Sequence, residues 1–65
     1  MDARAQTVYI VEFVVVGRSV KVTAIDPESL REVSMVGSPL LPRKMLARQA
    51  VRKLEYVLRR DGVII

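Results

Sequence analysis

Lys and Arg side chains are concentrated in one C-terminal segment, and their type and spacing could serve to bind anionic groups. Seven of the eleven Lys and Arg residues lie between Arg43 and Arg60, where Glu55 is the single anion, while residues 1–42 carry four cations and five anions. At helical spacing, cations that recur in this way form a row that could follow phosphates or carboxylates. The candidate face for an anionic partner comprises Lys44, Arg48, Arg52 and Arg59, while Lys53 and Arg60 flank the apolar arc of the same helix.

Residues suited to catalysis or to metal binding are largely missing. The sequence has no His and no Cys, so it lacks the side chain that titrates near pH 7, the soft metal ligands and the most reactive nucleophile. Asp26 and Glu28 are close together, but Asp-Pro-Glu is typical of a turn, and two carboxylates form a poor cage for a metal ion. The three glycines are too widely spaced for a phosphate-binding loop. We therefore expect no enzymatic activity, no cofactor, no metal and no small-molecule substrate.

Length and composition limit the architecture and the compartment. Sixty-five residues form a single domain at most, residues 1–65, and a domain of this size is only marginally stable. A hydrophobic content of 51% argues against disorder. The absence of cysteine fits a reducing compartment. The sequence starts with polar residues, and the apolar stretch that follows contains Glu12. This pattern fits neither a signal peptide nor a membrane span. We expect a cytoplasmic protein without a membrane partner.

Two apolar segments predict a β-hairpin. Residues 7–16 are almost all β-branched or aromatic, and residues 19–25 alternate apolar and polar side chains as a half-buried strand does. Gly17 between them supplies the positive φ that the first central position of a two-residue type II′ turn requires. The register that follows pairs Val15 with Val20, Phe13 with Val22 and Val11 with Ala24.

A turn, a third strand and a helix complete the predicted fold. Asp26-Pro27 begins a type I turn, and residues 31–36 form the third strand. Pro42 suits the first turn of a helix that spans about 42–60. Gly62 is expected to cap this helix, and residues 61–65 form a tail. The apolar arc of that helix comprises Leu46, Ala47, Ala50, Val51, Leu54, Val57 and Leu58. The fold class is thus α+β: β-β-β-α, a three-stranded antiparallel meander with one C-terminal helix packed on one face.

The first strand has more apolar side chains than a single helix can cover. Tyr9, Val11, Phe13 and Val15 are expected under the helix, which leaves Glu12 and four apolar residues on the other face. Glu12 is expected to form a cross-strand ion pair with Lys21. An exposed apolar edge strand is an aggregation hazard, so we expect a homodimer through this strand. The candidate dimer surface comprises Val8, Ile10, Val14 and Val16. Alternatively, residues 63–65 fold back over this patch or add a short fourth strand.

Two functions fit these surfaces. The first is a non-enzymatic interaction module, a homodimer that binds a protein partner through the basic helix face or through the first strand. The alternative is a small nucleic-acid-binding protein that places the same cations on phosphates, with Lys21 assisting from the sheet. Exposed aromatic side chains that could stack on single-stranded bases are scarce, and a basic helix face also serves simply to keep an apolar chain in solution. A membrane-surface role for the helix is disfavoured because the sheet needs its apolar side.

Three strings of the sequence resemble a family of very short alphaproteobacterial proteins of unknown function. They are VKVTAIDP at residues 20–27, EVSMVG at 32–37 and VRKLEYVL at 51–58, and the resemblance covers roughly residues 8–58. Members of that family are sometimes labelled serine hydroxymethyltransferase, but 65 residues without His do not fit that cofactor chemistry. The family has Thr-Gly before the third strand where this chain has Ser29-Leu30. Because Leu tolerates positive φ poorly, a looser loop is expected there.

Overall fold

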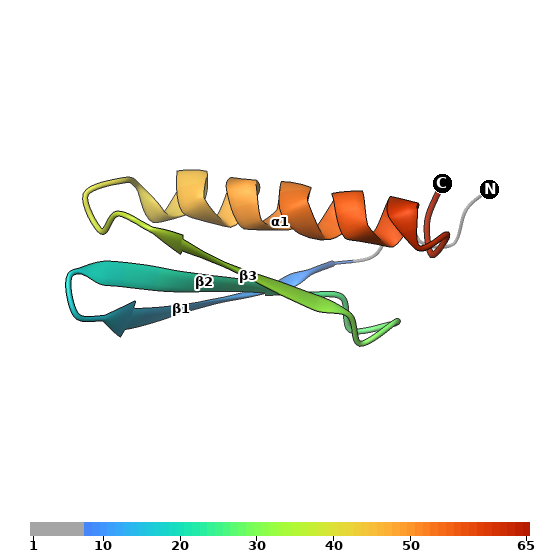
Figure 1. Ribbon diagram of the computed structural model, residues 1–65, viewed down its shortest axis with the longest axis horizontal. Coiled ribbons are helices and arrows are strands. Elements are labelled where there is room, and N and C mark those ends of the chain that lie inside the picture. The colour runs from blue at the N-terminus through green and yellow to red at the C-terminus, as the bar shows by residue number, and fades with distance from the viewer. Residues whose placement is uncertain (1–7) are drawn as a thin grey trace.

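Three strands and one helix form two layers in the computed structural model, which describes residues 8–65. The strands build one antiparallel sheet in the order β1-β2-β3, and the helix lies along one face of it (Figure 1). The elements are β1 (Ile10–Val16), β2 (Ser19–Ile25), β3 (Glu32–Gly37) and α1 (Arg43–Arg60). The predicted β-β-β-α architecture is confirmed.

The ends of the elements differ slightly from those predicted. β1 begins at Ile10, so Val8 and Tyr9 precede the strand, and residue 7 lies outside the described residues. Pro42 is the N-cap of α1 and not its first helical residue, because its ψ of 139° is extended. Its carbonyl oxygen nevertheless accepts hydrogen bonds from the N–H groups of Met45 and Leu46 at 3.0 and 3.2 Å, as expected of a residue half inside the helix.

The hairpin has the predicted register. Gly17 has a φ of 59° in the turn, and β1 and β2 pair Val15 with Val20, Phe13 with Val22 and Val11 with Ala24. Because side chains alternate across a sheet, this register directs every second residue of β2 toward the helix. Val20, Val22 and Ala24 are accordingly buried.

The core lies between β2 and α1. Leu46, Ala50, Leu54 and Leu58 recur every four residues on the inner side of the helix, and each is at most 1% exposed. The predicted apolar arc is thus confirmed, with Ala47, Val51 and Val57 half-buried along its borders. Half-buried side chains from the two edge strands, from the residue before β1 and from the tail pack against this core: Tyr9, Val11, Phe13, Val33, Met35, Val63 and Ile64.

Val15 was expected beneath the helix, and this prediction is wrong. Its side chain is 66% exposed although it has the same orientation as the half-buried Val11 and Phe13. The helix packs mainly on β2 and β3, and Val15 lies near the hairpin turn at the end of the edge strand β1. The inner face of β1 is therefore only partly covered.

The tail does not extend the sheet. The N–H groups of Val63 and Ile64 donate to the Leu58 carbonyl oxygen at 2.8 and 3.4 Å, and both side chains pack against the core. The tail therefore turns back on the helix side, and within residues 8–65 the sheet has three strands. The alternative in which residues 63–65 cover the outer face of β1 or add a fourth strand is wrong for the described part of the chain.

The loop between β2 and β3 is tight, whereas a looser loop was expected. Asp26 is completely buried, and its carboxylate accepts hydrogen bonds from the Glu28 N–H at 3.1 Å and the Ser29 hydroxyl at 2.6 Å. Its main chain closes the loop, because Asp26 N–H donates to the Arg31 carbonyl at 2.9 Å and Leu30 N–H donates to the Asp26 carbonyl at 2.8 Å. These bonds hold Leu30 at a φ of 62°, a left-handed conformation that costs a non-glycine residue about 1–2 kcal/mol.

We expect Leu30→Gly to stabilise the fold by up to about 1 kcal/mol. Glycine adopts the left-handed conformation without steric cost, and this gain exceeds the additional entropy that glycine loses on folding. Leu30 is exposed, so the substitution removes no core packing. Urea unfolding measures the effect. Leu30→Ala is the control, since it removes the side chain but keeps the strain. A glycine variant no more stable than the alanine variant would contradict the assignment of strain to this residue.

Candidate functional site

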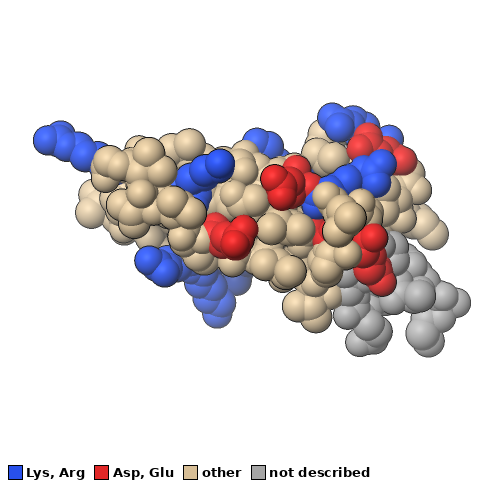
Figure 2. Space-filling model, turned by 90° about the horizontal axis from the view of Figure 1, so that it is seen from below, with Lys and Arg blue, Asp and Glu red and all other residues tan. Residues whose placement is uncertain are grey.

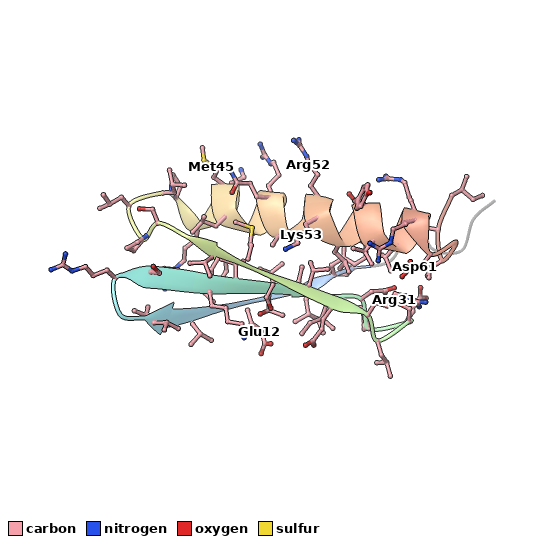
Figure 3. The ribbon with its side chains drawn as sticks, viewed as in Figure 1. Glu12, Arg31, Met45, Arg52, Lys53 and Asp61 are labelled. Atoms are coloured by element: carbon pink, nitrogen blue, oxygen red, sulfur yellow. The ribbon has the colours of Figure 1, made fainter. Side chains whose placement is uncertain are left out.

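The four cations of the candidate face lie on the solvent side of α1. Lys44, Arg48, Arg52 and Arg59 are all exposed, and Figure 3 shows Arg52 pointing away from the sheet. Lys44, Arg48 and Arg52 are spaced four residues apart, which places successive side chains about 6 Å apart along the helix axis. Within residues 8–65 no carboxylate pairs with any of the four. The predicted row is therefore present, and its charge is open to an anionic partner.

Shallow hollows accompany this row. The larger has a volume of about 450 Å³ and is lined by Lys44, Ala47, Arg48, Val51, Arg52 and Glu55. The smaller, of about 270 Å³, is lined by Pro42, Lys44, Met45 and Arg48. Both are open along the surface of a single helix, so they suit contact with a macromolecular surface better than enclosure of a small ligand.

Two other cations of α1 support the fold. Lys53 donates from Nζ to the Ser34 carbonyl oxygen at 2.8 Å, which ties the helix to β3. The Arg43 guanidinium carbon lies 5.1 Å from the centroid of the Phe13 ring, a cation–π contact that ties the start of the helix to β1. The sequence placed Lys53 beside the apolar arc of the helix, but neither contact was predicted, because each depends on how the helix lies over the sheet.

Asp61 links the end of the helix to the loop before β3, another contact that sequence reasoning missed. Its carboxylate oxygens lie 3.1 Å from Arg60 Nε and 3.2 Å from Arg31 Nε, and its side chain is about one third exposed, at 31%. The hydrogen bond from Arg60 lowers the pKa of Asp61, and the bond from Arg31 and both positive charges add to this, although desolvation opposes it. Figure 3 shows Arg31 and Asp61 side by side at one end of the molecule.

The predicted ion pair between Glu12 and Lys21 is wrong. The register places Glu12 opposite Thr23 and Lys21 opposite Val14, so the two charged residues are diagonal neighbours, and no ion pair joins them. Both side chains are exposed. Fixing two exposed long side chains in one geometry costs conformational entropy, and the screened attraction between their charges is too weak to offset that cost.

The outer β1 surface, which comprises Val8, Ile10, Val14 and Val16, is exposed as predicted. Each of these side chains is between 49% and 77% exposed. Polar residues of β2 and β3 share this sheet face, and the Thr23 and Ser34 hydroxyls lie 2.9 Å apart. Figure 2 shows this face with isolated charged side chains among uncharged ones. Among residues 8–65 no element covers it, and no strand pairs with the open edge of β1.

Two further findings concern possible sites. In the part of the chain that the structure describes, no three His, Cys, Asp or Glu side chains come together as a metal site would require. No helix within residues 8–65 is long and apolar enough to cross a membrane. The surfaces that distinguish this domain are thus the cation row and the outer β1 surface.

Comparison with known proteins identifies one family. Its profile, described as "Domain of unknown function (DUF6898)", matches residues 6–61. No curated protein and no solved structure matches the chain. The match includes β1, β2, β3 and α1, so the family describes the whole fold and adds no residue of known role.

We expect Asp61→Asn to lower the urea midpoint of unfolding at pH 7. The folded-state pKa of Asp61 lies below the ordinary value of 3.8, so the carboxylate contributes stability above that value and loses it as the pH falls through the lowered pKa. The difference in urea midpoint between the parent and Asp61→Asn should therefore shrink as the pH falls below about 3.8. Glu12→Gln, which removes a carboxylate without an ion pair, is the control. A gap that stays constant from pH 7 to pH 2 would contradict this role of Asp61.

Proposed function

Because the chain belongs to the family of the domain of unknown function DUF6898, which carries no assigned activity, we propose a function from its surfaces. The protein is a small non-enzymatic interaction module that forms a homodimer through β1 and binds a protein partner. The proposal places it in the cytoplasm of an alphaproteobacterium, in line with the sequence resemblance and the lack of cysteine. It includes no serine hydroxymethyltransferase activity.

The observation that carries the proposal is the uncovered apolar edge of β1. Val14 and Val16 are 54% and 58% exposed on the outer face, and the backbone of the same strand is open along its edge. Proteins usually pair or cover such an edge, because it otherwise offers a template for aggregation. A second copy of the same strand supplies both hydrogen-bonding groups and apolar side chains.

Glu12 favours one arrangement of the two strands. Antiparallel pairing with Phe13 on the two-fold axis uses all seven residues of β1 and places Glu12 opposite Val14 of the second copy. A register centred on Glu12 would place two carboxylates directly opposite each other, which destabilises a strand pair. The Phe13-centred register also extends the sheet to six strands, with both helices on the same side.

Val14→Glu should convert the homodimer to a monomer, as measured by light scattering. In the Phe13-centred register the new carboxylate faces Glu12 of the second copy, so the two like charges repel. The matched control is Val36→Glu, because Val36 is 70% exposed on the same sheet face but lies on the opposite edge strand, β3. Circular dichroism checks that both variants fold. A Val14→Glu variant that remains a dimer would exclude the β1 interface.

Nucleic-acid binding is the second candidate, and the unpaired cation row favours it. Lys44, Arg48, Arg52 and Arg59 could each contact a backbone phosphate, since none is engaged by a carboxylate within residues 8–65. Lys21 is exposed on the sheet face opposite α1, because its neighbours Val20 and Val22 are buried on the helix side, so Lys21 does not extend the same row. In this candidate function it contributes only to long-range attraction.

If phosphates bind the row, changing Arg48, Arg52 and Arg59 together to Gln should weaken oligonucleotide binding. The slope of log affinity against log salt should fall by about three, one for each lost phosphate contact. Fluorescence anisotropy with duplex and single-stranded oligonucleotides measures this. The control changes Arg18 and Lys21 to Gln, which removes two positive charges outside the row and leaves the ion pairs of Asp61 intact. Equal binding by the row variant and the parent would rule out this face.

A further inference from the structure

Two leucines protrude from the loop between β3 and α1. Leu40 is 93% exposed and Leu41 is 39% exposed. The loop is well defined: Leu40 N–H donates to the Ser38 hydroxyl at 3.1 Å, and Leu41 N–H donates to the Ser38 carbonyl at 3.2 Å. Pro39 and Pro42 fix φ on either side of the pair. The loop therefore holds apolar side chains outward, and neither the core nor the outer β1 surface includes them.

Met45 extends this apolar protrusion onto the first turn of α1. Its side chain is 45% exposed, and Figure 3 shows it pointing away from the sheet. We call the three residues Leu40, Leu41 and Met45 the leucine tip. Exposed apolar side chains gathered at one point usually mark a contact site. A protruding tip suits a soft or deformable partner, whereas a rigid partner would need a matching groove.

Cations surround the leucine tip, and carboxylates do not. Arg43, Lys44 and Arg48 lie on the first turns of α1, which has no acidic residue in its first turn although a helix N-terminus favours one. The turn between β1 and β2, which contains Arg18, lies at the same end of the molecule (Figure 1). On the sheet face that Figure 2 shows, this end has Lys and Arg side chains but no Asp or Glu. The opposite end contains most of the carboxylates of residues 8–65: Asp26, Glu28, Glu32 and Asp61.

We propose that this end of the molecule docks on the surface of a bilayer that contains anionic phospholipids. Leu40 and Leu41 enter the boundary between headgroups and acyl chains, and the surrounding cations contact lipid phosphates. Neither feature suffices alone, because stable peripheral binding needs two signals, such as an apolar insertion and a basic patch. The apolar side of α1 is buried against the sheet and is not available to a membrane. The leucine tip is a separate surface, outside the helix arc.

Sedimentation of the full chain with phospholipid vesicles tests this proposal. The protein should bind vesicles of equal parts phosphatidylcholine and phosphatidylglycerol, and should not bind phosphatidylcholine alone. Leu40→Ser with Leu41→Ser should lower the affinity at least about tenfold, because two apolar side chains no longer enter the bilayer. The matched control is Leu30→Ser, since Leu30 is 78% exposed in a loop at the opposite end. This control should bind like the parent.

Charge variants test the second half of the proposal. Lys44→Gln with Arg48→Gln should weaken vesicle binding more than Arg52→Gln with Arg59→Gln, which removes two cations of the same helix farther from the leucine tip. Failure to bind anionic vesicles at low salt would overturn the proposal. So would equal binding by the parent and the Leu40/Leu41 variant, which would indicate adsorption by charge alone. Binding of soluble polyglutamate with the same dependence on Leu40 and Leu41 would reassign the tip to an acidic protein.

Discussion

The fold depends on the contact between one helix and one strand. Leu46, Ala50, Leu54 and Leu58 of α1 pack against Val20, Val22 and Ala24 of β2, and these seven residues make up the buried apolar core. A chain of this length has little other apolar burial with which to offset the entropy of folding. Since β2 is the central strand, the helix can stabilise the whole sheet by covering it, and the two edge strands are then attached through β2.

Individual side-chain contacts attach the edge strands and the loops to the α1–β2 core. Arg43 lies over Phe13 in β1, and Lys53 bonds to the Ser34 carbonyl in β3, so the helix contacts each edge strand through a cation. Asp26 organises the loop after β2 from a buried position, and Asp61 connects the end of the helix to Arg31. Several cations of the basic segment thus have structural roles, while the row that includes Arg48 and Arg52 stays open to solvent.

The parts of the fold that sequence predicted are those that local periodicity determines. The alternation in β2, the turn at Gly17 and the spacing of leucines in α1 follow from the side-chain periods of strand and helix. The exposure of Val15, by contrast, depends on which strands the helix crosses. The conformation of Leu30 depends on the hydrogen bonds of Asp26, and the position of Val63 depends on the end of the helix. The cation row was predicted because it needs only helical spacing, whereas the leucine tip was overlooked because loop residues have no period to indicate their exposure.

The order of the strands has a kinetic consequence. Each strand pairs with the strand next to it in the chain, so the hairpins β1–β2 and β2–β3 close loops of only a few residues. Such connectivity gives a low contact order, and chains with mostly local contacts cross their folding barrier quickly. The docking of α1 onto β2 is the one long-range step, and we expect it to limit the folding rate. The apolar inner face of the sheet would then be exposed in a partly folded chain only briefly, which reduces the time available for misassembly.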